Sequence, residues 1–426
     1  MALNITPEQS RFFYEKSDDA ICIISATGEL LVSNPAAERL LGISSEDKSK
    51  IWNAIPYIKG NDDFIQLFID AVTQKLTSQE DIVDYVDNKG DVHNLHVRVT
   101  FYKQEIAVYL IVITDLTKLI KVRSAFARYT TPDIADYVLS TEEGQKIGGA
   151  TQNVTILMSD LRGFTALSSK LPAQDLITVL NHYFRHMVAV IEKYHGTLIE
   201  FLGDGILVIF GAPKFWEDHA ALAVKCAIEM ENAIADVNKW NNEHGYPEIE
   251  MGIAINTGDT VVGNIGSEKT MKYGCIGQSV NIAGRLEGLT IGGQILITEN
   301  TRKAITEKLD IASEDTFLPK GADVLKYYDI TGIEDIKLAR KSGEFSWGDE
   351  ISEEYELFFL EEKKVNETPH KCIIVKMSED NKYAQIKPEV ALRYRSNIML
   401  KKGDARSYAK VIRQDDEGYI ICFTSV

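Results

Sequence analysis

The middle of the chain alternates two kinds of segment, and this alternation limits the possible folds more than any other feature. Short apolar runs, which are typical of buried strands, occur at VTILMSDL, ILVIFG and QILIT. Long amphipathic segments lie between them. In residues 173–196, one helical face carries Leu176, Leu180, Tyr183, Phe184, Met187 and Ile191. Strands and helices in this order predict an α+β domain with one mixed sheet.

The other segments of this region, residues 151–333, complete the prediction. TLIEF and ILVIFG form a hairpin around LGDG, and a helix follows from Trp216 to about Glu243. Next come the strands IEMGIAIN and TVVGNIG, a loop and helix at QSVNIAGRLEGL, and a final strand VLKYYDITG. A ferredoxin-like core with additions accommodates this order of elements.

The length and the flanking sequences predict further domains, because 426 residues are too many for one ordinary core. We expect a sensor-like domain at 1–115, a helical linker at 116–150, an acidic linker at 334–366 and a small β-barrel at 367–426. The acidic stretch GDEISEEYELFFLEEKK is interpreted as a solvated helix or linker. The barrel is predicted from alternating segments such as KCIIVKM and GYIICFTSV. It loosely resembles a PilZ domain, but that family's Arg-x-x-x-Arg and Asp/Asn-x-Ser-x-x-Gly ligand motifs are not found, so cyclic-di-GMP binding is not expected.

The N-terminal region contains two strand candidates, AICIIS and ELLVSN, followed by the helix PAAERLLG with Asn34 as its cap and Pro35 at its first position. The phrase AICIISATGELLVSNPAAERLLGIS and the ending VITDLT resemble a PAS domain, which implies an α/β sensor whose ligand is unknown. His93 and His96 are weighed as haem ligands, although a strand histidine is more often an ordinary surface or core residue.

The linker places apolar residues three, four and three positions apart, at Leu119, Val122, Phe126 and Tyr129. This is the spacing of a short coiled coil, and its place between a sensor and an output domain favours a parallel dimer. The alternative is an amphipathic helix that lies on a neighbouring core.

Charge and cysteine content narrow the class of protein. The net charge of −17 argues against a surface for nucleic acid or anionic membrane, which would need a basic face. The five cysteines are scattered and form no CxxC pair, as expected of reduced thiols in a cytosol. The first residues lack the pattern of a signal peptide. The longest apolar run, about eight residues from Ile106, is shorter than the ~20 that a membrane span needs. We therefore expect a cytoplasmic protein without a membrane or nucleic-acid partner.

Two carboxylates follow strand-like runs in settings that suit phosphate and metal. Asp160 ends VTILMSDL, and Asp204 lies between two glycines at the tip of the predicted hairpin. Either alone would be interpreted as an ordinary turn residue. Together, in a sheet that places the first strand beside the hairpin, they form a pair that can bind hard cations such as Mg²⁺.

Four segments in the same order resemble the catalytic domain of class III adenylyl and guanylyl cyclases: VTILMSDLRGFT, GTLIEFLGDGILVIFG, MGIAINTGDTVVGNIGS and KYGCIGQSVNIAGRLEG. The resemblance implies that Asp160 and Asp204 bind two Mg²⁺ or Mn²⁺ ions per site. It also implies that Asn281 and Arg285 steady the ribose and the transition-state phosphate, and that Lys320 contacts the triphosphate. The implied reaction converts GTP or ATP into a 3′,5′-cyclic nucleotide and pyrophosphate.

The positions that select the base depart from the adenylyl pattern. Where adenylyl cyclases usually carry Lys and guanylyl cyclases Glu, this chain has Glu200. A carboxylate accepts hydrogen bonds from guanine N1–H and N2–H₂, whereas adenine N1 is itself an acceptor. The second position falls at Gly274, with Cys275 as the alternative if the match is shifted by one residue. We favour GTP as the substrate, with ATP as the alternative; Glu200 could also point to solvent and leave the choice to other groups.

The family resemblance also implies a homodimer with shared active sites, because metal residues come from one chain and base and ribose residues from the other. The competing hypothesis is a non-enzymatic signalling platform. Such a platform is expected to have lost part of the set Asp160, Asp204, Asn281 and Arg285, and this chain has all four.

Overall fold

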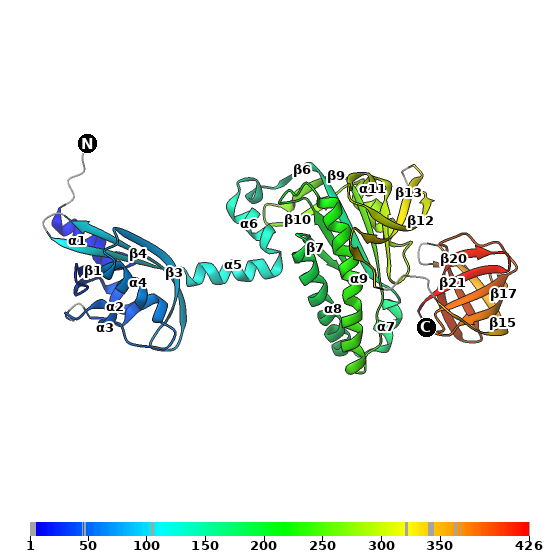
Figure 1. The fold of residues 1–426 in the computed structure, drawn as a ribbon, viewed down its shortest axis with the longest axis horizontal. Coiled ribbons are helices and arrows are strands. Elements are labelled where there is room, and N and C mark those ends of the chain that lie inside the picture. The colour runs from blue at the N-terminus through cyan, green and yellow to red at the C-terminus, as the bar shows by residue number, and fades with distance from the viewer. Residues whose placement is uncertain are drawn as a thin grey trace. The chain divides into compact units, whose positions relative to one another are not determined.

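The structure, a computed structural model, describes residues 6–425 except 45, 47, 104–105, 320–322, 340–344, 362–363 and 367. The chain divides into two compact units, Met1–Tyr129 and Thr130–Val426. The first unit contains an N-terminal domain, which ends at Asp115, and the helix that follows it. The second contains a central domain, residues 130–339, and a C-terminal barrel, residues 346–425 (Figure 1).

The N-terminal domain is a five-stranded antiparallel sheet with the strand order β2-β1-β5-β4-β3. Its strands are β1 (Ala20–Ser25), β2 (Leu30–Ser33), β3 (Ser78–Val86), β4 (Val92–Lys103) and β5 (Ala107–Asp115). Its helices are α1 (Pro7–Lys16), α2 (Pro35–Leu41), α3 (Ile51–Ala54) and α4 (Asp62–Thr73). The predicted cap of α2 is confirmed, because Asn34 Oδ1 accepts a hydrogen bond from the Ala37 amide at 2.9 Å.

Both histidines weighed as haem ligands contact carboxylates of this domain. His93 Nδ1 lies 3.0 Å from Asp115 Oδ2, and His96 Nε2 lies 2.7 Å from Glu80 Oε1. These contacts are typical of ordinary partly exposed histidines on a sheet and favour that interpretation over haem ligation.

The predicted linker, residues 116–150, is helical in its first part, at α5 (Thr117–Tyr129), whereas its last residues, from Gly148, already belong to a strand. No residue of this helix is buried within the described part of the chain. No helix among the described residues is both long and apolar enough to cross a membrane.

The central domain is built on one mixed sheet of nine strands, which confirms the predicted architecture. Seven strands follow the order β12-β13-β11-β9-β6-β8-β7, while β10 pairs with β9 and β14 with β13. The strands β9 and β11 are parallel and the other pairs antiparallel. The bounds are β6 (Gly148–Leu161), β7 (Thr197–Leu202), β8 (Gly205–Phe210), β9 (Met251–Ser267), β10 (Thr270–Ile276), β11 (Gln294–Thr298), β12 (Leu309–Phe317), β13 (Leu325–Ile333) and β14 (Ile336–Lys337).

Helices cover both faces of this sheet. On one face, α8 and α9 lie side by side and pack on Leu157 and Ile253 (Figure 1). On the other face, α10 packs Ala283 against Ile156, a neighbour of Leu157 whose side chain points the opposite way. The helices are α6 (Pro132–Ser140), α7 (Phe164–Lys170), α8 (Ala173–Lys193), α9 (His219–Glu243), α10 (Gln278–Glu287) and α11 (Glu299–Ala304), with a 3₁₀ turn at Glu143–Gln145.

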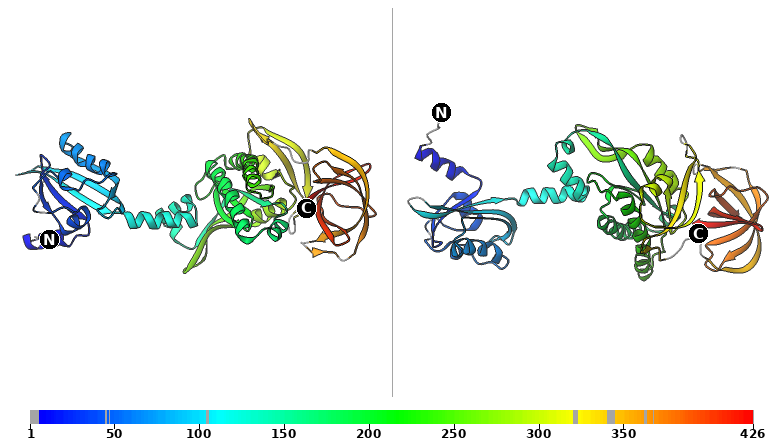
Figure 2. Two further views of the ribbon diagram at one scale, coloured as in Figure 1. Left: turned by 90° about the horizontal axis from the view of Figure 1, so that it is seen from below. Right: turned by 45° about the horizontal axis from the view of Figure 1, so that its top comes forward.

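The C-terminal barrel closes because β15 pairs with both β17 and β19. The views in Figure 2 show its strands wrapped around one interior. Six strands form the closed ring in the order β15-β17-β18-β21-β20-β19, and β16 pairs with the last residues of β15 beyond the ring. The bounds are β15 (Trp347–Glu361), β16 (Lys364–Val365), β17 (His370–Ser378), β18 (Tyr383–Pro388), β19 (Asn397–Lys402), β20 (Ala405–Asp415) and β21 (Gly418–Ser425).

The prediction of a helix or linker throughout 334–366 is wrong, because most of the acidic stretch forms the strand β15. Alternate residues of β15, namely Tyr355, Leu357 and Phe359, contact the barrel core, while the acidic residues Glu354 and Glu356 alternate with the first two of them. A period of two places one set of side chains inward even where the net charge is high. The barrel thus begins near Trp347 rather than at residue 367.

Candidate active site

The two predicted metal carboxylates meet at one end of the central sheet. Asp160 is the last residue but one of β6, and Asp204 lies in the two-residue turn between β7 and β8. Because β6 and β8 are antiparallel, with Ser159 opposite Ile206, the end of β6 lies beside the start of β8. Residues 44 positions apart in the sequence are thereby brought together.

The glycines that flank Asp204 make this approach possible. Gly203 has a φ of 74°, the left-handed conformation that a tight hairpin turn requires. A Cβ atom on Gly205 would lie 2.8 Å from the Ser159 carbonyl oxygen and 3.3 Å from Asp160 Oδ1. A side chain at residue 205 would therefore force the turn away from Asp160.

The electrostatics of the pair fit a bound cation. Burial, followed by the nearby Asp160 carboxylate, raises the pKa of Asp204 from 3.8 to about 7. Asp204 Oδ2 is buried and has no hydrogen-bond partner within the described residues. A buried carboxylate oxygen without a partner is costly, and a divalent cation would both neutralise the repulsion and occupy that oxygen. Asp160 and Asp204 thus have the donor chemistry that Mg²⁺ or Mn²⁺ requires.

Arg162, which the sequence did not single out, is the cation beside this pair. Its Nη2 donates to Asp160 Oδ2 at 3.2 Å and to the Asp160 carbonyl at 3.1 Å. The same guanidinium contacts the Glu287 carboxylate at the end of α10. Its position in the DLRGFT turn, two residues after Asp160, was the signal available in the sequence.

The predicted ribose and phosphate residues lie on α10. Asn281 and Arg285 are exposed and one helical turn apart, while Ala283 and Leu286 between and beside them are buried. They therefore share the outward face of the helix, as their spacing predicts. The structure places this face on a different element from the carboxylate pair.

The two positions that the sequence predicts to select the base lie on β7 and β10, which contact each other. Glu200, an exposed residue of β7, has its Oε1 atom 2.6 Å from Lys272 Nζ of β10. Gly274 is two residues beyond Lys272 on the same strand, so both positions lie on one face of β10. Lys272 is a further residue that the sequence did not single out.

Cys275, the alternative to Gly274 in the predicted base-selecting position, points into an apolar cluster. Cys275 packs against the apolar cluster that contains Tyr273 and Ala283, and burial raises the pKa of its thiol to about 11. Its side chain therefore lies on the opposite face of β10 from Lys272. The remaining predicted site residue, Lys320, lies outside the described residues.

Comparisons with known proteins point to one family. Residues 148–332 match the family model "Adenylate and Guanylate cyclase catalytic domain". Adenylate cyclase 1 of Rhizobium meliloti is 29% identical over 185 residues, which are 43% of this chain and 28% of that protein. The adenylate cyclase of Anabaena cylindrica is 32% identical over 198 residues, which are 44% of this chain and 38% of that protein.

A solved structure is also similar. The guanylyl cyclase Cya2 is 45% identical, and the match covers 45% of this chain and 100% of that chain with a TM-score of 0.44. The chain spans between 28% and 38% of the length of the two curated relatives described above.

The matched segment contains the carboxylate pair, the β7–β8 hairpin, β10 and α10. Sequence motifs, the mixed sheet and the family match agree on this region. Residues 148–332 are therefore a class III adenylyl and guanylyl cyclase catalytic domain.

Proposed function

We propose that this chain is an active nucleotide cyclase that converts a purine nucleoside triphosphate into its 3′,5′-cyclic monophosphate and pyrophosphate. The observation that carries the proposal is the pair Asp160 and Asp204, with the buried and unpartnered Oδ2 of Asp204. Mg²⁺ or Mn²⁺ held by these two carboxylates would activate the ribose hydroxyl and neutralise the leaving pyrophosphate. An inactive platform has no need to keep two carboxylates in such a costly arrangement.

The residues of α10 supply the remaining interactions of the proposed reaction. Asn281 can hold a ribose oxygen through its side-chain amide. Arg285 can donate two N–H groups to the phosphate as negative charge builds on it, which stabilises the transition state more than the ground state. Both side chains are on the exposed face of the helix, where a substrate can reach them.

We propose a homodimer in which one chain supplies the carboxylates and the other supplies Asn281 and Arg285. The helix α5 supports dimerisation, because its predicted coiled-coil positions Leu119, Val122 and Tyr129 are 64%, 60% and 90% exposed. An apolar stripe of this kind is covered when two such helices pair in parallel. The alternative, an amphipathic helix on a neighbouring core, finds no support within the first unit, since no residue of α5 is buried there.

The proposed substrate is GTP. Glu200 can accept from guanine N1–H and N2–H₂, and Lys272 beside it can donate to the O6 acceptor on the same edge. Adenine would present its amino group to the lysine instead. ATP remains the alternative substrate, because the two curated relatives described above are named adenylate cyclases.

The flanking domains are proposed to regulate this activity. The N-terminal domain has its own core and continues directly into α5, which suits a PAS-like sensor that acts through a dimer helix. Its ligand is unassigned, and a PilZ-like assignment of the barrel rests on the sequence pattern alone. A cytoplasmic location is proposed from the sequence pattern of scattered cysteines.

A product assay tests the proposal. Purified protein is incubated with Mg²⁺ or Mn²⁺ and with each of the four nucleoside triphosphates, and the products are resolved by mass. We expect cyclic GMP to form faster than cyclic AMP. If no triphosphate gives a cyclic product, the proposed activity is wrong and the inactive platform is favoured.

A further inference from the structure

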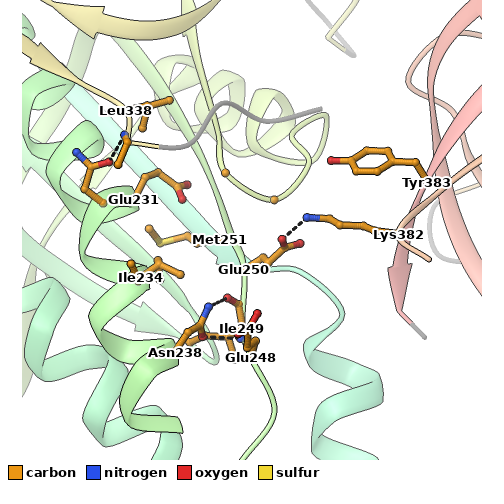
Figure 3. A pocket seen from close by; sticks show the side chains of 15 residues that line it. Glu231, Ile234, Asn238, Glu248, Ile249, Glu250, Met251, Leu338, Lys382 and Tyr383 are labelled. Carbon is orange, nitrogen blue, oxygen red and sulfur yellow. Dashed lines mark hydrogen bonds and ion pairs between the residues drawn. The ribbon is translucent and has the colours of Figure 1, made fainter. Parts of the chain in front are cut away.

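Within the described part of the chain, an apolar contact of Ile291 with Tyr383 and Cys422 joins the C-terminal barrel to the central domain, and three cationic side chains of the barrel add polar contacts. Lys382 contacts the Glu250 carboxylate beside a cavity of about 150 Å³, where Figure 3 shows Lys382 and Tyr383 of the barrel facing Glu250 and Glu231. The other two cations, Arg395 and Lys410, have different targets. They bind the loop that follows α10.

Both of these side chains donate to backbone carbonyls of this loop. Lys410 Nζ donates to the Thr290 carbonyl at 3.0 Å and also to the Gly288 carbonyl. Arg395 Nη1 donates to the Leu289 carbonyl at 3.1 Å. Three successive carbonyls thus receive hydrogen bonds from the barrel.

The first of these carbonyls belongs to Gly288, the C-cap of α10, and the other two belong to the two residues that follow it. The carbonyls at the end of a helix lack intrahelical partners and carry partial negative charge, so cations there stabilise the helix end. The helix in question carries Asn281 and Arg285. The barrel therefore caps the element that holds two of the proposed substrate-binding residues.

The same loop is connected to the carboxylate pair through Arg162. Arg162 Nη1 lies 3.5 Å from the Thr290 carbonyl, the atom that also accepts from Lys410. The other end of the guanidinium holds Asp160 and Glu287. The Thr290 carbonyl thus contacts both Lys410 of the barrel and Arg162, which in turn contacts the end of α10 and the proposed metal ligand Asp160.

Burying the two cations Arg395 and Lys410 costs free energy, and simple attachment of the barrel would not require it. Lys410 is 2% exposed and Arg395 8% exposed, so two cations are buried close together. Burial, followed by Arg162 and Arg395, lowers the pKa of Lys410 to about 7. Arg395 also adopts a φ of 64°, which is strained for a residue with a side chain.

We propose that Lys410 and Arg395 are positioning residues for the cyclase reaction: by holding the carbonyls of residues 288–290, the barrel orients α10 and, through Arg162, the Asp160 carboxylate. The inference rests on the proposed function of Asp160, Asn281 and Arg285. It makes the barrel a part of the catalytic apparatus and a route by which a signal can reach the site.

The test uses the full chain with Lys410→Met, Arg395→Met and the conservative Arg395→Lys. For the Met variants we expect kcat to fall about 10-fold, because small displacements of reacting groups are costly, with a KM for GTP close to that of the wild type. Arg395→Lys, which keeps the positive charge and a group that can donate but loses the planar guanidinium, should be intermediate. A second measurement does not depend on turnover. Mn²⁺ is added without nucleotide and the melting temperature is recorded. Lys410→Met should need a higher Mn²⁺ concentration than the wild type for the same rise in melting temperature. In an Arg162→Met background, Lys410→Met should add no further change to this response.

Two lysines of the barrel serve as controls. Lys402 pairs with Glu353 on the exposed surface of the barrel, with its Nζ atom 2.8 Å from Glu353 Oε2, and Lys402→Met should leave kcat, KM and the Mn²⁺ response unchanged. Lys382→Met weakens the attachment at Glu250 without touching residues 288–290, and it should leave kcat within about 2-fold of the wild type. If Lys382→Met is as damaging as Lys410→Met, the barrel acts through attachment in general and the inference is wrong.

The outcomes separate the inference from the proposed function. If the wild type makes cyclic nucleotide while Lys410→Met and Arg395→Met keep its kcat and Mn²⁺ response, the inference fails and the proposed function stands. If the wild type makes no cyclic nucleotide, the proposed function fails. A normal Mn²⁺ response in Lys410→Met then overturns the inference as well.

Discussion

The Asp204→Asn substitution probes the carboxylate pair directly, because it should change activity and stability in opposite directions. In the metal-free protein, burial and Asp160 raise the pKa of Asp204 from 3.8 to about 7. A carboxyl whose pKa rises on folding favours the folded state below pH 4, and this contribution is lost as the pH rises to about 7. At pH 8 the ionised Asp204 therefore costs stability, and an uncharged amide of the same shape removes that cost.

The size of the effect follows from the shift in pKa. About three pKa units at 1.36 kcal/mol each give an upper bound of about 4 kcal/mol. Asp204 is only partly buried, so water screens the repulsion and a gain of about 1–2 kcal/mol is the realistic expectation. For a domain of this size, that gain corresponds to a rise in melting temperature of about 2–8 °C at pH 8.

Thermal melts in the presence of a chelator at pH 8 and pH 5 measure the change in stability, and an assay of product formation measures the change in activity. The gain in melting temperature should be smaller at pH 5, where the folded wild type keeps Asp204 protonated. Turnover should fall by at least ~10²-fold, the cost of losing one transition-state stabiliser elsewhere. Mn²⁺ should raise the melting temperature of the wild type at pH 8 and have little effect on the variant.

The matched control is Asp236→Asn, an exposed position on α9, which should change neither quantity. A variant that melts at or below the wild-type temperature at pH 8 would refute the argument from charge repulsion. A variant with a near-normal rate would refute the metal assignment instead.

Three further predictions concern assembly and substrate. Mixing folded but inactive Asp160→Ala and Arg285→Ala chains should restore up to one working site per heterodimer, and the absence of any recovered cyclase rate would contradict the shared site. Glu200→Lys should lower the ratio of kcat/KM for GTP over ATP by at least ~10-fold, because a site that hydrogen-bonds its substrate rejects a mismatch strongly. The switch should be complete only with Gly274→Asp, and an unchanged ratio in Glu200→Lys would mean that residue 200 does not contact the base. Lys272→Ala should also lower this ratio, by loss of a donor to guanine O6; steady-state kinetics with both nucleotides decide, and a ratio that rises would contradict this role.

Much of the central domain could be predicted because its strands have local patterns. The segments VTILMSDL, ILVIFG and QILIT are apolar enough to be recognised without knowing their neighbours. The strand β9 was predicted as two strands, since Thr257, Gly258 and Asp259 are typical of a turn. These residues continue the strand because each pairs with a residue of β6, which supplies hydrogen bonds along the whole length.

The strand β15 shows the opposite failure. Its many acidic residues favoured a solvated segment, although the alternation of Tyr355, Leu357 and Phe359 was present in the sequence. The high charge favours a solvated segment and the alternation favours a strand, and the local sequence does not decide between the two. Pairing with β17 and β19 decides between them, because it buries the apolar alternate residues inside a closed barrel.

The candidate site divides in the same way. The types and positions of Asp160, Asp204, Asn281 and Arg285 were evident from short motifs, because each motif is contained in a few consecutive residues. The partners of these motifs were not evident. Three cations that contact these motifs or the loop beside them have partners far away in the sequence. Arg162 contacts Glu287, Lys272 contacts Glu200 and Lys410 contacts Thr290, and no local pattern indicates these pairs.

The sequence by itself determined the succession of strands and helices in the central domain and the residues able to bind metal and nucleotide. Only the tertiary structure decided that Asp204 has a buried oxygen without a partner, and that the barrel holds the end of α10 through Lys410. The physical reason is that periodicity and motifs are local properties, whereas burial and hydrogen bonding depend on segments more than 100 residues apart, as Lys410 and Thr290 are. The free energy of a buried charge is set by those distant neighbours, and so the energetics of this site are a property of the fold.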